Sequence, residues 1–129
     1  MRIVVPERFV SKKTAISWAE AGMRQDKDAA WLSALNAAVI PHSADLRGMF
    51  ENGSRLRLRA TIYGDPQMIK PLDIHDALAQ IVNQLTDILF PREKGKPKPQ
   101  TQDRHFWKVE GEKVVDELPR VVLEIDSLE

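Results

Sequence analysis

The sequence contains no cysteine, which excludes disulfide bonds, thiolate metal sites and cysteine nucleophiles. The six glycines are scattered without the spacing of a phosphate-binding loop, and no nucleophile elbow surrounds a serine. The apolar run within the first ten residues is too short for a signal peptide or a membrane span. We therefore expect a cytoplasmic protein with no membrane contact and no disulfide framework.

A net charge is also lacking, because 19 basic residues balance 19 acidic ones. No overall field therefore favours a polyanionic partner. The distribution is uneven, since the stretch from Pro91 to Lys113 holds seven basic and four acidic residues and the tail from Val114 is mainly acidic. Such asymmetry is compatible with one basic face on a neutral body.

The length of 129 residues and the hydrophobic content of 43% suit one globular domain that spans residues 1–129. Apolar alternation and turn residues predict strands at 2–5, 55–63, 104–115 and 121–125, and helices at 26–39 and within 70–90. The order β-α-β-α-β-β, ending in a hairpin, predicts an α/β (α+β) fold. We expect a small mixed β-sheet of about four strands with two main helices packed on it.

Three connecting segments carry further expectations. Residues 15–21 are compatible with a short helical turn, and residues 48–54 contain the Gly and Asn typical of a turn. Residues 91–102 are rich in Lys, Pro, Gly and Gln and have no large apolar side chain to bury, so we expect a mobile basic insertion.

The helix at 26–39 places Trp31, Leu35 and Ala38 on one stripe. We expect Trp31 to anchor the core rather than to stack on nucleic-acid bases. Pro41 is expected to end this helix, because proline removes a backbone donor and disfavours helical structure in the residue before it.

The strand at 55–63 alternates between apolar and polar residues. Leu56, Leu58, Ala60 and Ile62 point one way, whereas Arg55, Arg57, Arg59, Thr61 and Tyr63 point the other way. The arginines are either a phosphate-binding footprint or the solvated outer face of a strand, and the pattern leaves both readings open. For Lys12 and Lys13 in the polar segment after the first strand, a solvated loop is favoured over a phosphate-contacting arm.

The stretch Lys70–Phe90 organises the chain. Apolar residues recur at three- and four-residue steps, which is the spacing of one buried helix face, and Asp73 after Pro71 suits an N-cap. Asp73, His75 and Asp76 form the one dense group of hard metal ligands, close to the positive end of the helix. Taken alone, this cluster is more typical of an ordinary capped helix than of a metal site.

The order of motifs resembles a known family. Val5-Pro6 followed by Val10-Ser11-Lys12-Lys13 is similar to the N-terminal segment of RusA-like crossover junction endodeoxyribonucleases, also called Holliday junction resolvases. In that family the motif D-x-D-N-x-x-K-x-x-x-D-A-L begins the central helix, and Asp73-Ile74-His75-Asp76 falls at its start. Asp103 matches a second acidic motif, and residues 117–125 fit the closing strand. The resemblance covers nearly the whole chain in layout, but each motif is degenerate.

The resemblance implies a homodimeric endonuclease of the kind common in phages and prophages, acting in DNA recombination or repair. Such enzymes bind branched or four-way junction DNA and hydrolyse phosphodiesters with Mg²⁺ or Mn²⁺. Carried over, Asp73, His75 and Asp103 would be catalytic and hold the metal. Asp76 would be a further metal ligand, and Lys70 a neighbouring catalytic cation. Contacts to the DNA backbone would come from Lys12, Lys13, Arg55, Arg57, Arg59, Arg92, Lys94, Lys96 and Lys98.

The chain also departs from the motif. His75 stands where the family has its second carboxylate, Asp76 replaces the asparagine, Asn83 replaces the later aspartate, and Ala79 occupies the place of the catalytic lysine. An alanine cannot stabilise charge on a phosphate in the transition state. Three hypotheses follow: an active junction endonuclease, a catalytically weakened DNA-binding relative with the same fold, and an interaction module that does not bind DNA.

Overall fold

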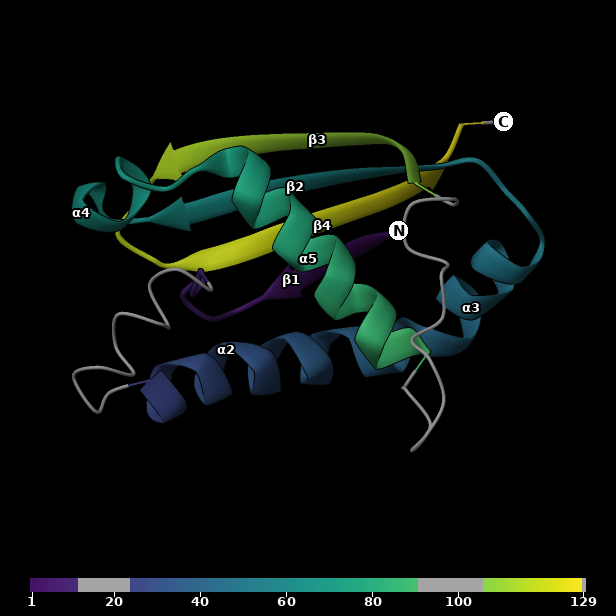
Figure 1. Cartoon of the computed structure of the whole chain (residues 1–129), viewed down its shortest axis with the longest axis horizontal. Helices are drawn as coiled ribbons and strands as arrows, with labels where there is room; N and C mark the ends of the chain where they lie inside the picture. The colour runs from purple at the N-terminus through teal and green to yellow at the C-terminus, as the bar shows by residue number, and fades with distance from the viewer. Residues whose placement is uncertain (12–23, 91–105, 129) are drawn as a thin grey trace.

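The computed structural model describes residues 1–11, 24–90 and 106–128 (Figure 1). Its elements in chain order are β1 (Arg2–Val5), α2 (Arg24–Val39), the 3₁₀ turn η1 (Ile40–His42), α3 (Ser43–Glu51), β2 (Leu56–Gly64), α4 (Pro66–Ile69), α5 (Ile74–Leu89), β3 (Phe106–Val115) and β4 (Arg120–Ser127). The helical turn expected at 15–21 and the insertion expected at 91–102 lie outside the described residues.

The strands form one four-stranded mixed sheet in the order β1-β4-β2-β3. β2 and β3 are parallel, and β4 runs antiparallel to both of its neighbours, β1 and β2. The prediction of a mixed α+β fold with a small sheet and two long helices is confirmed. The predicted final hairpin is wrong, because β4 inserts between β1 and β2 instead of pairing with β3. Its buried Val121, Leu123 and Ile125 suit this central position.

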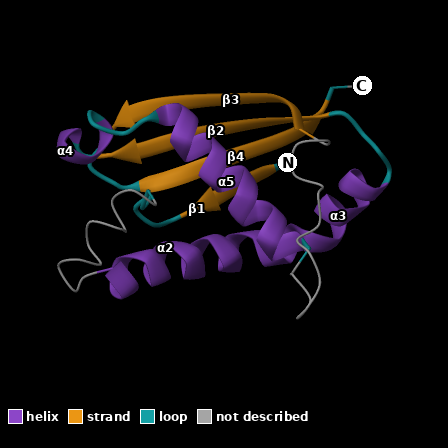
Figure 2. Cartoon of the chain, in the orientation of Figure 1, coloured by secondary structure: helices purple, strands orange, loops and turns teal. Residues whose placement is uncertain are grey.

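Helices α2 and α5 both pack on one face of the sheet, as Figure 2 shows. The alternation of β2 explains this layering, because Leu56, Leu58, Ala60 and Ile62 are fully buried beneath the helices. The opposite face of the sheet carries the arginines of β2 and is called the open face below. No helix of the described residues covers this face.

Trp31 joins α2 to the rest of the core. Its side chain is fully buried and packs edge-on against Phe9, with ring centroids 5.1 Å apart. The indole Nε1 donates a hydrogen bond to Gln84 Oε1 of α5 at 2.9 Å, so the one polar atom of the ring is satisfied. The prediction that Trp31 anchors the core is confirmed.

The helix α3 is a correction to the sequence prediction. The helix α2 ends at Val39, before Pro41, as predicted. Pro41 then occupies the first turn of η1, where its missing N–H removes no helical hydrogen bond, and an unpredicted helix follows to Glu51. The turn expected at 48–54 is therefore wrong over its first residues. The chain turns only at Asn52 and Gly53, and Gly53 has a φ of +69° that favours glycine.

A β-bulge at the start of β3 is a second correction. Phe106 pairs with Leu56, but Lys108 pairs with Arg57, so Trp107 is an extra residue in the ladder. Strict alternation along the strand predicted at 104–115 places Phe106, Lys108 and Glu110 on one face, and this prediction is wrong because the bulge breaks the alternation. Phe106 is buried against Phe50 on the helical side, whereas Lys108 and Glu110 lie beside the arginines.

None of the helices in the described ranges has the length and apolar character needed to cross a membrane.

Candidate functional site

Asp73 is the N-cap of α5, as the sequence predicts. Its backbone is extended, and its carboxylate Oδ1 accepts hydrogen bonds from the backbone N–H groups of His75 at 2.9 Å and Asp76 at 3.2 Å. These contacts satisfy two donors that the helix itself leaves unpaired. The carboxylate therefore lies at the positive end of a sixteen-residue helix.

Two clefts flank the exposed side of α5. The first, called the carboxylate cleft below, has a volume of about 580 Å³ and lies between α5, α4 and the segment that follows β1. The second, called the histidine groove, has a volume of about 570 Å³ and lies between α5 and β3. The carboxylate cleft is lined by Asp73 and Asp76 together with Arg8, Gln67 and other residues, and the histidine groove by His75, Leu78, Val82, Phe106 and Val109.

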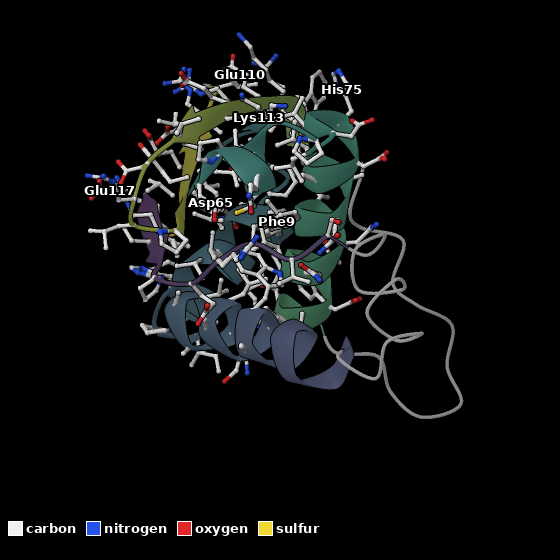
Figure 3. All side chains as sticks on the ribbon, turned by 90° about the vertical axis from the view of Figure 1, so that its left-hand side faces the viewer. Phe9, Asp65, His75, Glu110, Lys113 and Glu117 are labelled. Carbon is white, nitrogen blue, oxygen red and sulfur yellow. The ribbon has the colours of Figure 1, made fainter. Side chains whose placement is uncertain are left out.

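The three predicted ligands at the start of α5 do not share one cavity. Asp73 and Asp76 both line the carboxylate cleft, whereas His75 opens into the histidine groove. Neighbouring helix positions point about 100° apart, so His75 and Asp76 diverge. Figure 3 shows His75 projecting from the rim of the molecule, well away from the interior Phe9. Within the ranges 1–11, 24–90 and 106–128, no group of three or more His, Asp or Glu residues is arranged to hold a metal.

The positions that carry the family resemblance nevertheless lie together on the surface. Ala79 and Asn83 line both clefts, in line with His75 and Asp76 at helical three- and four-residue spacing. The positions between them, among them Ala77, Ile81 and Leu85, are buried in the core. The exposed stripe of α5 is therefore made of the residues that align with the charged and polar positions of the motif.

Lys113 supports the turn that leads into Asp73. This residue of β3 pairs with Ile62 of β2, and its Nζ donates hydrogen bonds to the carbonyl oxygens of Leu72 at 2.9 Å and Lys70 at 3.4 Å. Lys70 itself is exposed in this turn. Sequence reasoning misses Lys113, because its place depends on the pairing of two strands that are far apart in the chain. It also misses Gln67, and it reveals nothing of how Arg8 lies relative to Asp73.

The predicted DNA-binding arginines lie on the open face, opposite α5. Arg57 pairs with Asp126 at 3.1 Å and Arg59 pairs with Glu110 at 3.0 Å. Hydrogen bonds from Lys108 and Arg59 hold the pKa of Glu110 below its usual value, and those from Arg57 and the chain's amino terminus do the same for the pKa of Asp126. These arginines are therefore held in place by ion pairs and do not face the carboxylate cleft.

Seven predicted site residues lie outside the described residues, so the structure does not test them: Asp103, Lys12, Lys13, Arg92, Lys94, Lys96 and Lys98. Phe106, the first described residue after Asp103, lines the histidine groove together with His75. Comparisons of the chain with protein-family models, with curated proteins and with solved structures found no match.

Proposed function

We propose that this protein is a metal-dependent endonuclease that acts on branched DNA and works as a homodimer, in the manner of the RusA-like resolvases that its sequence resembles. One observation carries the proposal. The positions that align with the family motif all line the two clefts beside α5: Asp73, which matches it, and His75, Asp76, Ala79 and Asn83, which depart from it. Helical spacing alone places these positions on the exposed side of an amphipathic helix, so the support comes from the two clefts that lie beside them.

The carboxylate cleft suits a divalent cation. Asp73 and Asp76 supply hard oxygen ligands, and Mg²⁺ is commonly held by one or two carboxylates together with waters and substrate phosphates. When bound, the ion would lower the pKa of a coordinated water and neutralise charge on the phosphate. His75 and Asp103 remain proposed ligands, and the imidazole would favour Mn²⁺ over Mg²⁺.

The remaining polar groups of the cleft suit a phosphate backbone. Arg8 brings a guanidinium to the same cleft as the two carboxylates, where it can pair with a phosphate oxygen in a bidentate manner. The N-terminus of α5 adds the partial positive charge that favours anions. Lys70, exposed in the turn before Asp73, is the proposed catalytic cation in place of the missing lysine. DNA binding by these groups should weaken steeply as salt is added.

A catalytically weakened DNA-binding relative is the second candidate. Ala79 lines both clefts at the position where the family carries its catalytic lysine, so this site offers no charge to the transition state. His75 stands in place of a family carboxylate, so the metal would meet one negative charge fewer, and it opens into the histidine groove, away from Asp73 and Asp76. This candidate keeps DNA binding and the dimer without cleavage.

A nicking assay on four-way junction DNA separates the candidates. Wild-type protein is incubated with Mg²⁺ or Mn²⁺, beside Asp73→Asn and the control Asp65→Asn. Asp65 caps α4 through Met68 N–H at 2.9 Å and does not line the carboxylate cleft, so its substitution repeats the chemical change away from the site. Cleavage lost only in Asp73→Asn supports the endonuclease. Binding without cleavage supports the weakened relative, and no salt-dependent binding to any DNA refutes both.

A further inference from the structure

Trp107 is an exposed aromatic residue whose position requires an explanation. Its side chain is 65% exposed, although Trp31 in the same protein is fully buried. The bulge in β3 makes Trp107 the extra residue of the ladder, between the buried Phe106 and the solvent-facing Lys108. Bulges of this kind re-aim a side chain. The guanidinium of Arg55 lies 5.4 Å from the centre of the Trp107 ring, so one cation accompanies the exposed ring.

The open face is positively charged at the Trp107 end. Asp126 is shared between Arg57 and the chain's amino terminus, and Glu110 is shared between Arg59 and Lys108. Arg2 and Glu124 lie on the same face beside Arg59, so with Arg55 six cationic groups accompany three carboxylates. The ion pairs thus leave an excess of positive charge beside Trp107.

The opposite end of the open face has the reverse charge. Asp116 pairs with Arg120 at 3.5 Å, and the exposed Glu112 and Glu117 add two more carboxylates nearby. Figure 3, which views the molecule from this end, shows Glu117 and His75 on opposite sides of the sheet. The face is therefore polarised along the strands, and an anionic polymer would be attracted to the Trp107 end.

We propose that Trp107 and Arg55 form a stacking site for an unpaired nucleobase of single-stranded or branched DNA. Lys108 and Arg57, which are ion-paired with Glu110 and Asp126, would contact the adjoining phosphates by exchanging these carboxylate partners. Every nucleobase has a π-face, so an exposed indole with a neighbouring guanidinium binds bases without sequence preference. The inference rests on the proposed action on DNA and adds a recognition element outside the carboxylate cleft.

The histidine groove runs from the start of α5 to Phe106, the residue before Trp107. Phe106 and Val109, which flank the bulge, line the groove together with His75 and Asn83. The eight helical steps from His75 to Asn83 span about 12 Å along the helix axis. This length corresponds to about four stacked nucleotides at 3.4 Å each. A DNA strand that lies along the groove from the start of α5 would therefore end close to Phe106, the residue before Trp107.

The test compares two DNA ligands and three variants. A blunt duplex and a fork of the same duplex with ten-nucleotide single-stranded arms are titrated by fluorescence anisotropy against wild type, Trp107→Ala, Trp107→Phe and Leu118→Ala. Leu118 is 71% exposed at the acidic end of the sheet, so it controls for loss of an exposed apolar side chain. We expect Trp107→Ala to weaken binding to the fork about tenfold, which corresponds to about 1.4 kcal/mol. Binding to the duplex should change little, and Trp107→Phe should retain most of the affinity.

Other outcomes overturn the inference. Equal affinity of wild type and Trp107→Ala for the fork would remove the stacking site while leaving the endonuclease proposal intact. Equal loss on fork and duplex, accompanied by a shift from dimer to monomer in light scattering, would show that Trp107 contacts a second copy of the chain. Absence of binding to either DNA by wild type would refute both proposals. Loss of cleavage in Asp73→Asn with unchanged fork affinity would separate the two sites.

Discussion

Replacing Asp73 separates a structural role from a chemical one. In Asp73→Ala, the N–H groups of His75 and Asp76 lose their shared acceptor at 2.9 and 3.2 Å. Loss of an aspartate N-cap costs about 1 kcal/mol, and loss of its charge at the helix N-terminus adds about 0.5 kcal/mol. Asparagine caps a helix as well as aspartate does, so Asp73→Asn should lose only about 0.5 kcal/mol.

These free energies predict measurable shifts in the melting temperature. The entropy of unfolding of 129 residues is about 0.27 kcal/mol/K, so 1 kcal/mol corresponds to about 4 °C. Calorimetry should therefore show a decrease of about 6 °C for Asp73→Ala and about 2 °C for Asp73→Asn. Metal-dependent nicking should be lost in both variants, because neither retains the carboxylate. Wild-type nicking by Asp73→Asn would refute a metal-ligand role, and equal melting temperatures of the two variants would refute the capping role.

Substitutions at three further places test other parts of the structure: at two glycines, at Glu110 and at Ala79. Gly111→Ala should lower the free energy of unfolding in urea by about 1–3 kcal/mol, because the new Cβ would lie 2.8 Å from Ile74 Cγ1. Gly48→Ala should instead raise it by about 0.5–1 kcal/mol, because Gly48 lies within α3 and its Cβ would meet open space. The pKa of Glu110 is lowered in the folded state, so its carboxylate stabilises the fold above about pH 4.5 and loses this contribution as it is protonated at lower pH. Glu110→Gln should therefore lose less stability than wild type as the pH falls below about 4.5. Acid titrations of both proteins followed by circular dichroism test this, and identical curves would show that the ion pairs contribute nothing. Ala79→Lys should raise the rate of metal-dependent nicking by about tenfold or more, because it returns a cation to the position where the family carries its catalytic lysine. Ala79→Met should leave the rate unchanged. Equal nicking rates of the two variants would show that position 79 does not correspond to that lysine.

Local periodicity made much of this fold predictable. The alternation of β2 gives four fully buried side chains in the expected register, and the spacing in α5 gives its buried face. The cap at Asp73 follows from the preceding proline and from the short acceptor side chain. In each of these cases the residues that decide the structure are neighbours in the sequence, so the pattern contains the needed information.

The features that escaped prediction depend on residues far apart in the chain. The position of β4 between β1 and β2 depends on pairing with two strands that lie far from it in the sequence, which no local pattern of β4 reveals. The bulge at Trp107 depends on the register between β2 and β3. The helix α3 escaped for another reason: Pro41 was expected to end a helix, although proline also suits the first turn of the next one.

The candidate site has two explanations that must be weighed against each other. A capping aspartate at position 73 and an acidic residue in the first turn at position 76 are what any helix start favours, so these two carboxylates need no metal to explain them. A helix start does not explain the cleft that these carboxylates share with Arg8. A capped helix predicts that Mn²⁺ binds Asp73→Asn and wild type equally weakly. A metal site predicts that calorimetric titration with Mn²⁺ separates them while the Asp65→Asn control matches wild type.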